Sequence, residues 1–369
     1  MIAEQMPLNV TLMITEKCNL KCKYCYEVFS GNMKAQSMPF ARVKQAIDFY
    51  MTDEMFLRHG SINWDLIGGE VFAEFDLLKQ IIDYLVLKYQ QMGLCPRKYL
   101  ALSLCSNGTL FTEEVKAWAV EQRGRMKFFS IALSMDGIKA IHDEYRSHSF
   151  DRVMAAFPWW REHFPEGTIK GTICPDTLPY LFENVKFYVE DLQLPQFYIN
   201  PTFEGPWNED AGILYGDELI KCAAYFLEKP EYRVMNNSNL FAPAHIEFKE
   251  KKNWCGSGVH MRAISPDGTI YPCIRAATSK LHAIGHLDTG IQMERIVPFY
   301  FYTTHNDDKE CDACEFAPWC PSCVMQWVED TGDMYHRSKA ICMMTKARVI
   351  VSRYFVAHTT EDLTRREGE

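Results

Sequence analysis

The sequence has little that would attach it to a membrane or to nucleic acid. Within its 369 residues, no stretch approaches the roughly 18 consecutive apolar residues that a membrane-spanning helix needs. Residues 1–9 lack the basic start and the apolar stretch of a signal peptide. Lysine and arginine number 39 against 48 for aspartate and glutamate, so the net charge of −9 disfavours binding to phosphates. We therefore expect a cytoplasmic protein that binds neither membranes nor nucleic acid.

Cysteine, in contrast, is abundant. The composition, with 47% hydrophobic and 24% charged residues, is that of a soluble globular protein and excludes disordered and fibrous classes. Fourteen cysteines in a reducing compartment favour metal ligands over disulfides. Ten of them form two groups, three from Cys18 to Cys25 and seven from Cys255 to Cys342. The sequence therefore predicts two regions that hold metal.

Short apolar runs alternate with longer amphipathic stretches through the first part of the chain. This alternation predicts βα units and an α/β fold with a parallel sheet, here a partial (β/α)6 TIM barrel. In such a fold the active site lies at the carboxyl ends of the strands. The predicted strands are residues 8–15, 62–67, 99–105, 128–134, 169–174 and 196–202. The predicted helices are residues 39–56, 75–91, 112–121, 150–162, 178–192 and 210–227.

The composition changes after the sixth unit. Residues 1–235 are predicted to form the barrel and the Asn-rich residues 236–252 a linker. Residues 253–358 are rich in Cys, Gly and Pro, and we expect a β-hairpin, a helix near 340–358 and a core that is thin without metal. Residues 359–369 are predicted to be a solvated, charged tail.

The first cysteine group directly follows the first predicted strand. Its spacing is Cys18-x3-Cys22-x2-Cys25, with an aromatic residue, Tyr24, before the last thiol. Three close thiolates on one loop suit an iron–sulfur cluster, whereas a structural zinc site needs four ligands. Three cysteines on a four-iron cluster would leave one iron open to another molecule.

This motif resembles that of the radical S-adenosylmethionine (SAM) superfamily. The resemblance implies that the open iron binds the amino and carboxylate groups of SAM. It also implies that one electron cleaves SAM to methionine and a 5′-deoxyadenosyl radical, which abstracts hydrogen from substrate carbon. A flavodoxin- or ferredoxin-type protein would supply that electron.

Further motifs at the ends of predicted strands are similar to SAM-binding segments of this superfamily. Each of them alone is more often a turn, but their order along the chain matches the resemblance. Val71 departs from the resemblance, because the superfamily usually has a proline after the Gly-Gly-Glu residues. The SAM-binding residues implied are Tyr24, Gly68, Gly69, Glu70, Ser106, Asn107, Ser134, Asp136 and Arg146. Glu70 would accept a hydrogen bond from the ammonium of SAM, and Arg146 would bind a carboxylate.

The second cysteine group resembles the SPASM domain, which carries auxiliary iron–sulfur clusters in many radical SAM enzymes. One spacing departs, with two residues before Cys323 where three are usual. The resemblance assigns Cys311, Cys314, Cys320 and Cys342 to an outer cluster. It assigns Cys255, Cys273 and Cys323 to an inner one, which makes three [4Fe-4S] clusters in all. The inner cluster has an open iron or takes a further ligand such as His260 or a substrate thiol. A pair of zinc sites is the alternative.

The leading functional prediction is a peptide maturase that forms a thioether or other cross-link in a ribosomally made precursor, with epimerisation and carbon–carbon linkage as further possibilities. An anaerobic sulfatase-maturating enzyme ranks second, because Ile274 and Arg275 follow Cys273 where that group has an aspartate base. A non-catalytic redox sensor is the alternative of another class. Only seventeen residues precede Cys18, so we expect a separate leader-binding protein or recognition by the barrel itself. Cys174 is predicted to be buried packing or, as a sharper hypothesis, a hydrogen donor.

Overall fold

The computed structural model describes residues 6–26, 36–202, 205–232, 240, 253, 255–301, 309–320 and 323–366. Most of the predicted linker, residues 236–252, therefore lies outside the described residues. The chain divides into two compact units, and each is described by itself. Unit 1 comprises Met1–Ser134, Ser149–Gly167 and Cys255–Tyr302, and unit 2 comprises Met135–His148, Thr168–Trp254 and Thr303–Glu369.

A parallel sheet forms the centre of unit 1. Strand β1 (Leu8–Thr15) pairs in parallel with β2 (Ile62–Gly68), which continues through β3 (Ala101–Ser106) to β4 (Phe128–Ser134). Nearly all of β1 is buried, as expected of a strand covered on both faces, and its sequence is correspondingly apolar. These strands lie at their predicted positions to within two residues.

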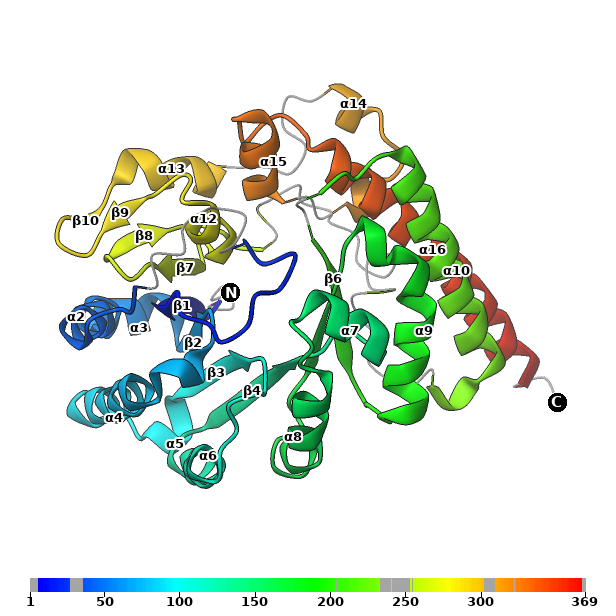
Figure 1. Ribbon diagram of the computed structural model, residues 1–369. Helices are drawn as coiled ribbons and strands as arrows, with labels where there is room; N and C mark the ends of the chain where they lie inside the picture. Colours follow the sequence, from blue (N-terminus) through cyan, green and yellow to red (C-terminus); the bar gives the residue numbers. More distant parts are fainter. Residues whose placement is uncertain are drawn as a thin grey trace. The chain divides into compact units, whose positions relative to one another are not determined.

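Helices follow each of these strands and pack on the sheet (Figure 1). Helix α4 (Phe75–Gln91) presents Leu78, Ile81, Ile82 and Leu85 to the core, which is the spacing of one helical face. The other helices of this part are α2 (Phe40–Tyr50), α3 (Asp53–His59), the 3₁₀ helix η1 (Val71–Glu74), α5 (Pro96–Tyr99), α6 (Glu113–Arg125) and α8 (Phe150–His163).

The helix predicted over residues 39–56 is two helices. The Thr52 side chain accepts a hydrogen bond from the backbone N–H of Met55 at 3.3 Å and thereby starts α3 anew. Asp53 and Glu54 in the first turn favour the same start, since they face the positive end of the helix dipole.

A segment from the cysteine-rich region completes unit 1. Strand β7 (Met261–Ile264) pairs in parallel with β1, so this segment extends the barrel sheet by a pairing that no local pattern predicts. Strand β8 (Thr269–Tyr271) forms the predicted β-hairpin with β7. The remaining elements are α12 (Ile274–Ser279), β9 (Gly285–His286), β10 (Gly290–Ile291) and α13 (Met293–Phe301). The strand order in this unit is β10-β9-β8-β7-β1-β2-β3-β4.

Unit 2 contains the last two barrel strands, β5 (Ile169–Ile173) and β6 (Phe197–Pro201), which pair in parallel. The long helices α10 (Glu209–Glu228) and α16 (Lys339–Arg366) lie side by side (Figure 1). Helix α16 continues beyond residue 358 into the segment predicted to be a tail. The other elements are α7 (Lys139–Tyr145), η2 (Pro175–Tyr180), α9 (Leu181–Lys186), the π-helix η3 (Phe187–Asp191), η4 (Pro230–Tyr232), α14 (Lys309–Asp312), η6 (Ala317–Trp319) and α15 (Val324–Thr331).

A glycine at the interface between α10 and α16 allows these two helices to pack closely. Gly212 brings α10 so near to α16 that an added Cβ would lie 3.1 Å from Cβ of Met343. Among the helices that the structure describes, none is long and apolar enough to cross a membrane.

Candidate functional site

The first cysteine loop begins directly after β1. The backbone N–H of Leu20 donates to Sγ of Cys18 at 3.4 Å, and the N–H of Cys25 donates to the carbonyl of Cys22 at 3.1 Å. Burial raises the pKa of Cys18, and the hydrogen bond from Leu20 opposes this rise. Cys22, Tyr24 and Cys25 are all half-buried on the same loop. Three cysteines on one loop, of which Cys18 accepts a backbone N–H bond at its sulfur, fit the ligand set of an iron–sulfur cluster.

Two glycines at the end of β2 lie against this loop. The N–H of Gly69 donates to the carbonyl of Thr15 and the N–H of Glu70 to that of Lys17, both at 2.9 Å. A Cβ added to Gly69 would lie 2.4 Å from the Lys17 carbonyl oxygen and 2.9 Å from Cβ of Cys18. Glycine is therefore required here, because only a residue without a side chain lets the two backbones approach so closely.

The Glu70 carboxylate joins this turn to the end of β3. It is 1% exposed, and its Oε1 accepts hydrogen bonds from Oγ of Ser106 at 2.8 Å and from the N–H of Phe72 at 3.2 Å. Its Oε2 accepts from the N–H of Asn107 at 2.7 Å. The predicted partners Glu70, Ser106 and Asn107 thus lie together, and the carboxylate receives donors from its own chain.

Two residues without a predicted role extend this network. Nδ2 of Asn107 donates to Oδ1 of Asn19 at 2.9 Å and lies 3.9 Å from Sγ of Cys18. Asn19 in turn donates to Oγ1 of Thr109 at 2.8 Å. Asn19 stands in the spacer between Cys18 and Cys22, and Thr109 follows the Ser-Asn-Gly turn. In the sequence, only their positions next to motif residues indicate that Asn19 and Thr109 belong to this network.

In unit 2, the residues that follow β4 form a buried ion pair. Nε of Arg146 donates to Oδ2 of Asp136 at 2.8 Å, and the two side chains are 10% and 1% exposed. Oδ1 of Asp136 also accepts from the N–H of Thr172 at 2.9 Å, which ties this turn to β5. Asp136 and Arg146, both predicted to bind SAM, thus contact each other. Ser134, in unit 1, lies with its Oγ 3.7 Å from Sγ of Cys105.

A buried histidine supports the same turn. Nδ1 of His142 accepts from the N–H of Asp136 at 3.3 Å, so the hydrogen bond needs the neutral ring. Burial lowers the pKa of His142 to about 4. The charge of Asp136 opposes this decrease, but burial outweighs it.

Stability should therefore fall with acidification. Below about pH 6.5 the unfolded chain protonates His142, whereas the folded protein keeps it neutral to about pH 4. Acid thus favours the unfolded state, and His142 alone should lower the free energy of unfolding by about 2 kcal/mol between pH 7 and pH 5. Urea denaturation at both pH values measures this. A His142→Asn variant should show a smaller fall, and equal falls in both proteins would contradict the assignment.

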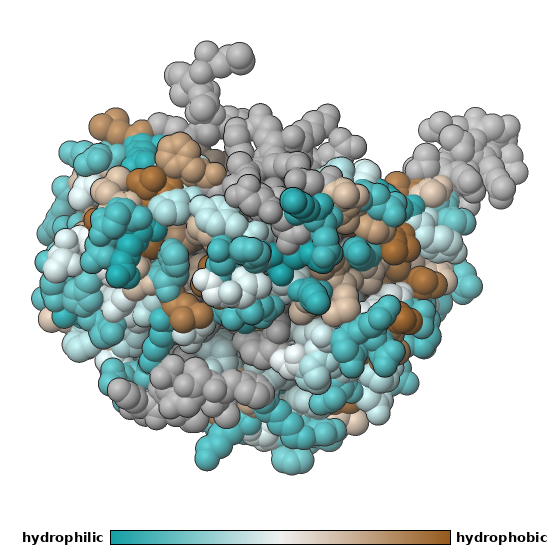
Figure 2. Space-filling model, turned by 90° about the horizontal axis from the view of Figure 1, so that it is seen from above, coloured by the Kyte–Doolittle hydropathy of each residue, from teal (hydrophilic) through white to brown (hydrophobic). Residues whose placement is uncertain are grey.

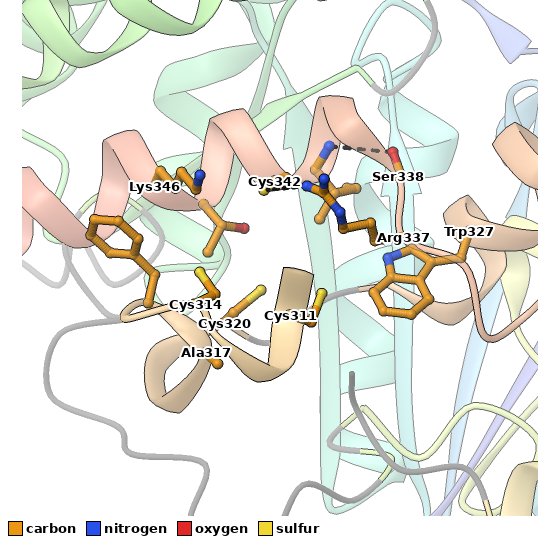
Figure 3. Close-up of a pocket in the computed structure, with 12 residues that line it drawn as sticks. Cys311, Cys314, Ala317, Cys320, Trp327, Arg337, Ser338, Cys342 and Lys346 are labelled. Atoms are coloured by element: carbon orange, nitrogen blue, oxygen red, sulfur yellow. Dashed lines mark hydrogen bonds between the residues drawn. The ribbon is translucent and has the colours of Figure 1, made fainter. Parts of the chain in front are cut away.

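The predicted outer set of cysteines surrounds one cavity in unit 2. Successive turns bring Cys311, Cys314 and Cys320 to one side, since the N–H groups of Cys314, Ala317 and Cys320 each bond the carbonyl three residues earlier. Cys342 faces them from the first turn of α16 (Figure 3). Nη1 of Arg337 donates to Sγ of Cys342 at 3.5 Å, a bond that stabilises a thiolate.

Apolar side chains close this cavity. Phe316, Ala317 and Ile341 line it, and Lys346 adds a second cation (Figure 3). Four thiols, two cations and an apolar wall suit an anionic iron–sulfur cluster. Within the described ranges, no group of three or more His, Cys, Asp or Glu side chains is arranged to hold a single metal ion.

The three cysteines predicted for the inner cluster do not all lie in one unit. Cys255 and Cys273 belong to unit 1, where a 2.9 Å hydrogen bond from the N–H of Gly258 to the carbonyl of Pro272 joins their neighbourhoods. Cys323, at the start of α15, belongs to unit 2. The ring of His260 packs edge-on against His59, with 5.6 Å between the ring centroids.

Cys174 occupies a helix start. It is 9% exposed, its Sγ lies 3.6 Å from Oγ1 of Thr177, and its N–H donates to that oxygen at 2.9 Å. These contacts form a capping box at the start of η2. They account for its burial, and its role as a hydrogen donor stays a prediction.

A family model described as the radical SAM superfamily matches residues 12–179, which contain the first cysteine loop and the Gly68-Gly69 turn. This chain carries a radical SAM domain. The family implies one [4Fe-4S] cluster and SAM, and the three cysteines of the Cys18 loop, with the N–H of Leu20 donating to Sγ of Cys18, fit that cluster.

Two relatives that align with most of this chain are named for bacteriocin biosynthesis and for sulfatase maturation. "Antilisterial bacteriocin subtilosin biosynthesis protein AlbA" of Bacillus subtilis is 23% identical over 356 residues, covering 92% of this chain and 72% of that protein. The "cysteine-type anaerobic sulfatase-maturating enzyme" of Clostridium novyi is 22% identical over 348 residues, covering 84% and 85%.

Solved structures resemble this chain over nearly its whole length. Native anSMEcpe with bound AdoMet and Cp18Cys peptide has a TM-score of 0.72 at 17% identity and covers 97% of this chain and 99% of that chain. Streptococcus suis SuiB bound to precursor peptide SuiA has a TM-score of 0.59 at 16% identity, covering 91% and 76%. Together with the parallel strands, these likenesses confirm the predicted fold class, an α/β partial barrel followed by a cysteine-rich region.

Proposed function

We propose that this protein is a radical SAM peptide maturase, which abstracts hydrogen from a ribosomally made precursor and forms a thioether or another cross-link. The observation that supports this most is the network that holds the Cys18 loop, the Gly68-Gly69 turn and the Ser106-Asn107 turn together through Glu70. The peptide substrate is supported by AlbA and SuiB, which are named for a bacteriocin and a precursor peptide.

Each residue of the network has a task in this proposal. When bound, a [4Fe-4S] cluster and SAM supply a radical that abstracts hydrogen from carbon. Cys18, Cys22 and Cys25 would hold the cluster, and the Gly68-Gly69 backbone, which approaches the cysteine loop closely, would bind SAM beside it. Glu70 would position the loops through the three hydrogen bonds that its oxygens accept from its own chain. A carboxylate has about four acceptor sites, so Glu70 would also accept from the ammonium of SAM, as predicted.

For the other end of SAM we propose Ser134 and Arg146, with Tyr24 at the loop. Asp136 would fix the orientation of Arg146 through their 2.8 Å contact. A guanidinium held by one carboxylate keeps a defined orientation for a second anion, which a lysine would not.

We further propose that residues 253–358 hold two auxiliary [4Fe-4S] clusters, linked to the barrel residues 1–235 by residues 236–252. Cys311, Cys314, Cys320 and Cys342 would hold the outer one, supported by their common cavity and the Arg337 donor. Cys255, Cys273 and Cys323 would hold the inner one, with a substrate thiol or another ligand completing it.

The outer cluster gives a quantitative prediction. Replacing Cys314 and Cys342 together with alanine should lower iron by about four atoms per chain after anaerobic reconstitution, because two thiolates are too few to hold a [4Fe-4S] cluster. Iron and acid-labile sulfide are measured together with zinc. The matched control is Cys95→Ala, an exposed thiol, which should keep the full iron content. Zinc in place of iron would overturn the cluster assignment.

Two measurements test the function itself. Reductive cleavage of SAM to 5′-deoxyadenosine under dithionite tests radical chemistry, and its absence in reconstituted protein would favour a redox sensor. Mass spectrometry of a small Cys-rich peptide co-expressed anaerobically tests the substrate. A loss of two hydrogens indicates a cross-link, whereas epimerisation leaves the mass unchanged.

Anaerobic sulfatase maturation is the second candidate. It is supported by the Clostridium novyi relative, which aligns over 85% of its length. Against it stands α12, which begins at Ile274 directly after Cys273 and carries Arg275 where an aspartate base is expected. Incubation with a sulfatase-derived cysteine peptide decides between the two, since formylglycine formation there would replace the leading proposal.

A further inference from the structure

A second cavity, of about 370 Å³, lies in unit 1 away from the cysteine loop. It opens at the amino end of β1, where Leu8, the first residue of the strand, forms part of its wall. The Cys18 loop follows the other end of the same eight-residue strand, which spans about 25 Å. The volume falls within the range of about 300–1,000 Å³ that is typical of ligand pockets.

The polar wall of this cavity is cationic. Arg58 and Arg262 line it, together with His59, and none of the described residues that line it is acidic. Burial lowers the pKa values of His59 and of the neighbouring His260, so the charge comes from the two arginines. Two guanidinium groups without a facing carboxylate are unusual in a protein whose net charge is −9.

Two buried donors lie in the wall of this cavity, behind the surface that a ligand could touch. Tyr50 is fully buried and Arg262 is 6% exposed. The Tyr50 hydroxyl and Nε of Arg262 have no hydrogen-bond partner among the residues that the structure describes. Burial raises the pKa of Tyr50 to about 12, so its hydroxyl remains a donor at neutral pH. Buried donors left unpaired are costly, and their uncompensated N–H and O–H dipoles keep this wall of the cavity electropositive.

Other contacts fix the two arginines. Nη1 of Arg262 donates to the carbonyl of Met261 at 2.7 Å, and Nη2 of Arg58 donates to the hydroxyl of Tyr300 at 2.8 Å. The Arg58 guanidinium also lies 5.8 Å from the centre of the Tyr300 ring. The cationic wall is thus oriented by the protein itself.

The opposite wall is apolar and is supplied by α13. Met293, Ile296, Val297 and Phe301 line the cavity, and Met293 and Phe301 are 63% and 77% exposed. The space-filling view shows hydrophobic residues, in brown, gathered over α13 (Figure 2). A ligand that fits both walls carries an anionic group and an apolar body.

We propose that this cavity is a binding site for a carboxylate attached to an apolar body, such as a fatty-acid-like anion or the carboxylate end of an apolar peptide. The carboxylate would accept from the guanidinium groups of Arg58 and Arg262, and the apolar body would lie along α13. The arginine fork suits the two oxygens of a carboxylate. The site is separate from the proposed radical chemistry and does not depend on it.

Isothermal titration of the anaerobic holoenzyme with defined probes tests this site. Octanoate should bind saturably, whereas octylamine and inorganic phosphate should bind at least tenfold more weakly. N-acetyl-leucyl-leucine and its C-terminal amide distinguish the two sources, because tighter binding of the dipeptide acid than of octanoate would indicate a peptide. Absence of saturable binding by both acids, or phosphate binding as tight as octanoate, would overturn the proposal.

Variants locate the binding. Arg58→Met and Arg262→Met should each raise the Kd for octanoate about tenfold or more, since each removes a hydrogen bond to a charged group. Arg58 is exposed and its variant should fold even if the Arg262 variant does not. Arg97→Met, which removes an exposed charge on α5, is the matched control and should leave the Kd unchanged. Equal Kd values for all three variants would refute the site.

Discussion

Replacement of Gly69 by alanine should lower the rate of SAM cleavage about 100-fold, the effect expected of a displacement of about 1 Å at a reacting centre. The added methyl group would lie 2.4 Å from the Lys17 carbonyl oxygen and 2.7 Å from the Lys17 carbonyl carbon. Both atoms belong to backbone and cannot rotate away, so the Cys18 loop itself must move. The rate is measured as 5′-deoxyadenosine formed per iron in reconstituted protein.

Gly124→Ala is the matched control for this substitution. Nothing lies within 4 Å of a Cβ added to Gly124, which stands in helix α6. Alanine there should keep the full rate and add about 0.8–1 kcal/mol of stability. A Gly69→Ala enzyme with unchanged iron content and rate would show that the approach of the two backbones is not needed.

Replacement of Arg146 by methionine should lower the free energy of unfolding by about 3–5 kcal/mol, because it leaves the Asp136 carboxylate charged and buried without its cation. The Asp136 side chain is 1% exposed, and its Oδ1 also accepts from the N–H of Thr172. Urea denaturation under anaerobic conditions, followed by tryptophan fluorescence, measures the loss.

A neighbouring ion pair within helix α7 provides the control. Nζ of Lys139 lies 3.2 Å from Oδ2 of Asp143, and the lysine side chain is 52% exposed. Lys139→Met should cost at most about 1 kcal/mol, as exposed pairs do. Adding Asp136→Asn to Arg146→Met should recover part of the loss. A double variant as unstable as the sum of its two single changes would contradict a direct contact.

The barrel strands could be predicted because their periodicity is local. Alternating or continuous apolar runs bounded by turn residues located β1 and β4 at both ends, and α4 followed from its apolar stripe. The break between α2 and α3 was also present in the sequence, since Thr52 precedes two acidic residues. Helix α7 was missed because seven residues give too few turns to show a period.

The candidate site likewise has features that the sequence predicts and contacts that it does not. Cysteine spacing and the Gly68-Gly69 pair are visible in the sequence, whereas the hydrogen bonds of Glu70 depend on the approach of β2 to β3. The cavity beside α13 was also hidden, because Tyr50, Arg58 and Arg262 meet only through the pairing of β7 with β1. Pairings between strands so far apart in sequence leave no local pattern.

That pairing makes the barrel dependent on the cysteine-rich region for its edge. Residues 9–12 of β1 bond to β7, so a fragment ending at residue 235 would expose an apolar edge strand with unpaired backbone groups. The two parts are therefore not modules that can be exchanged or expressed separately. Any precursor of this fold that lacked the second region would have needed another strand, or a polar edge, at β1.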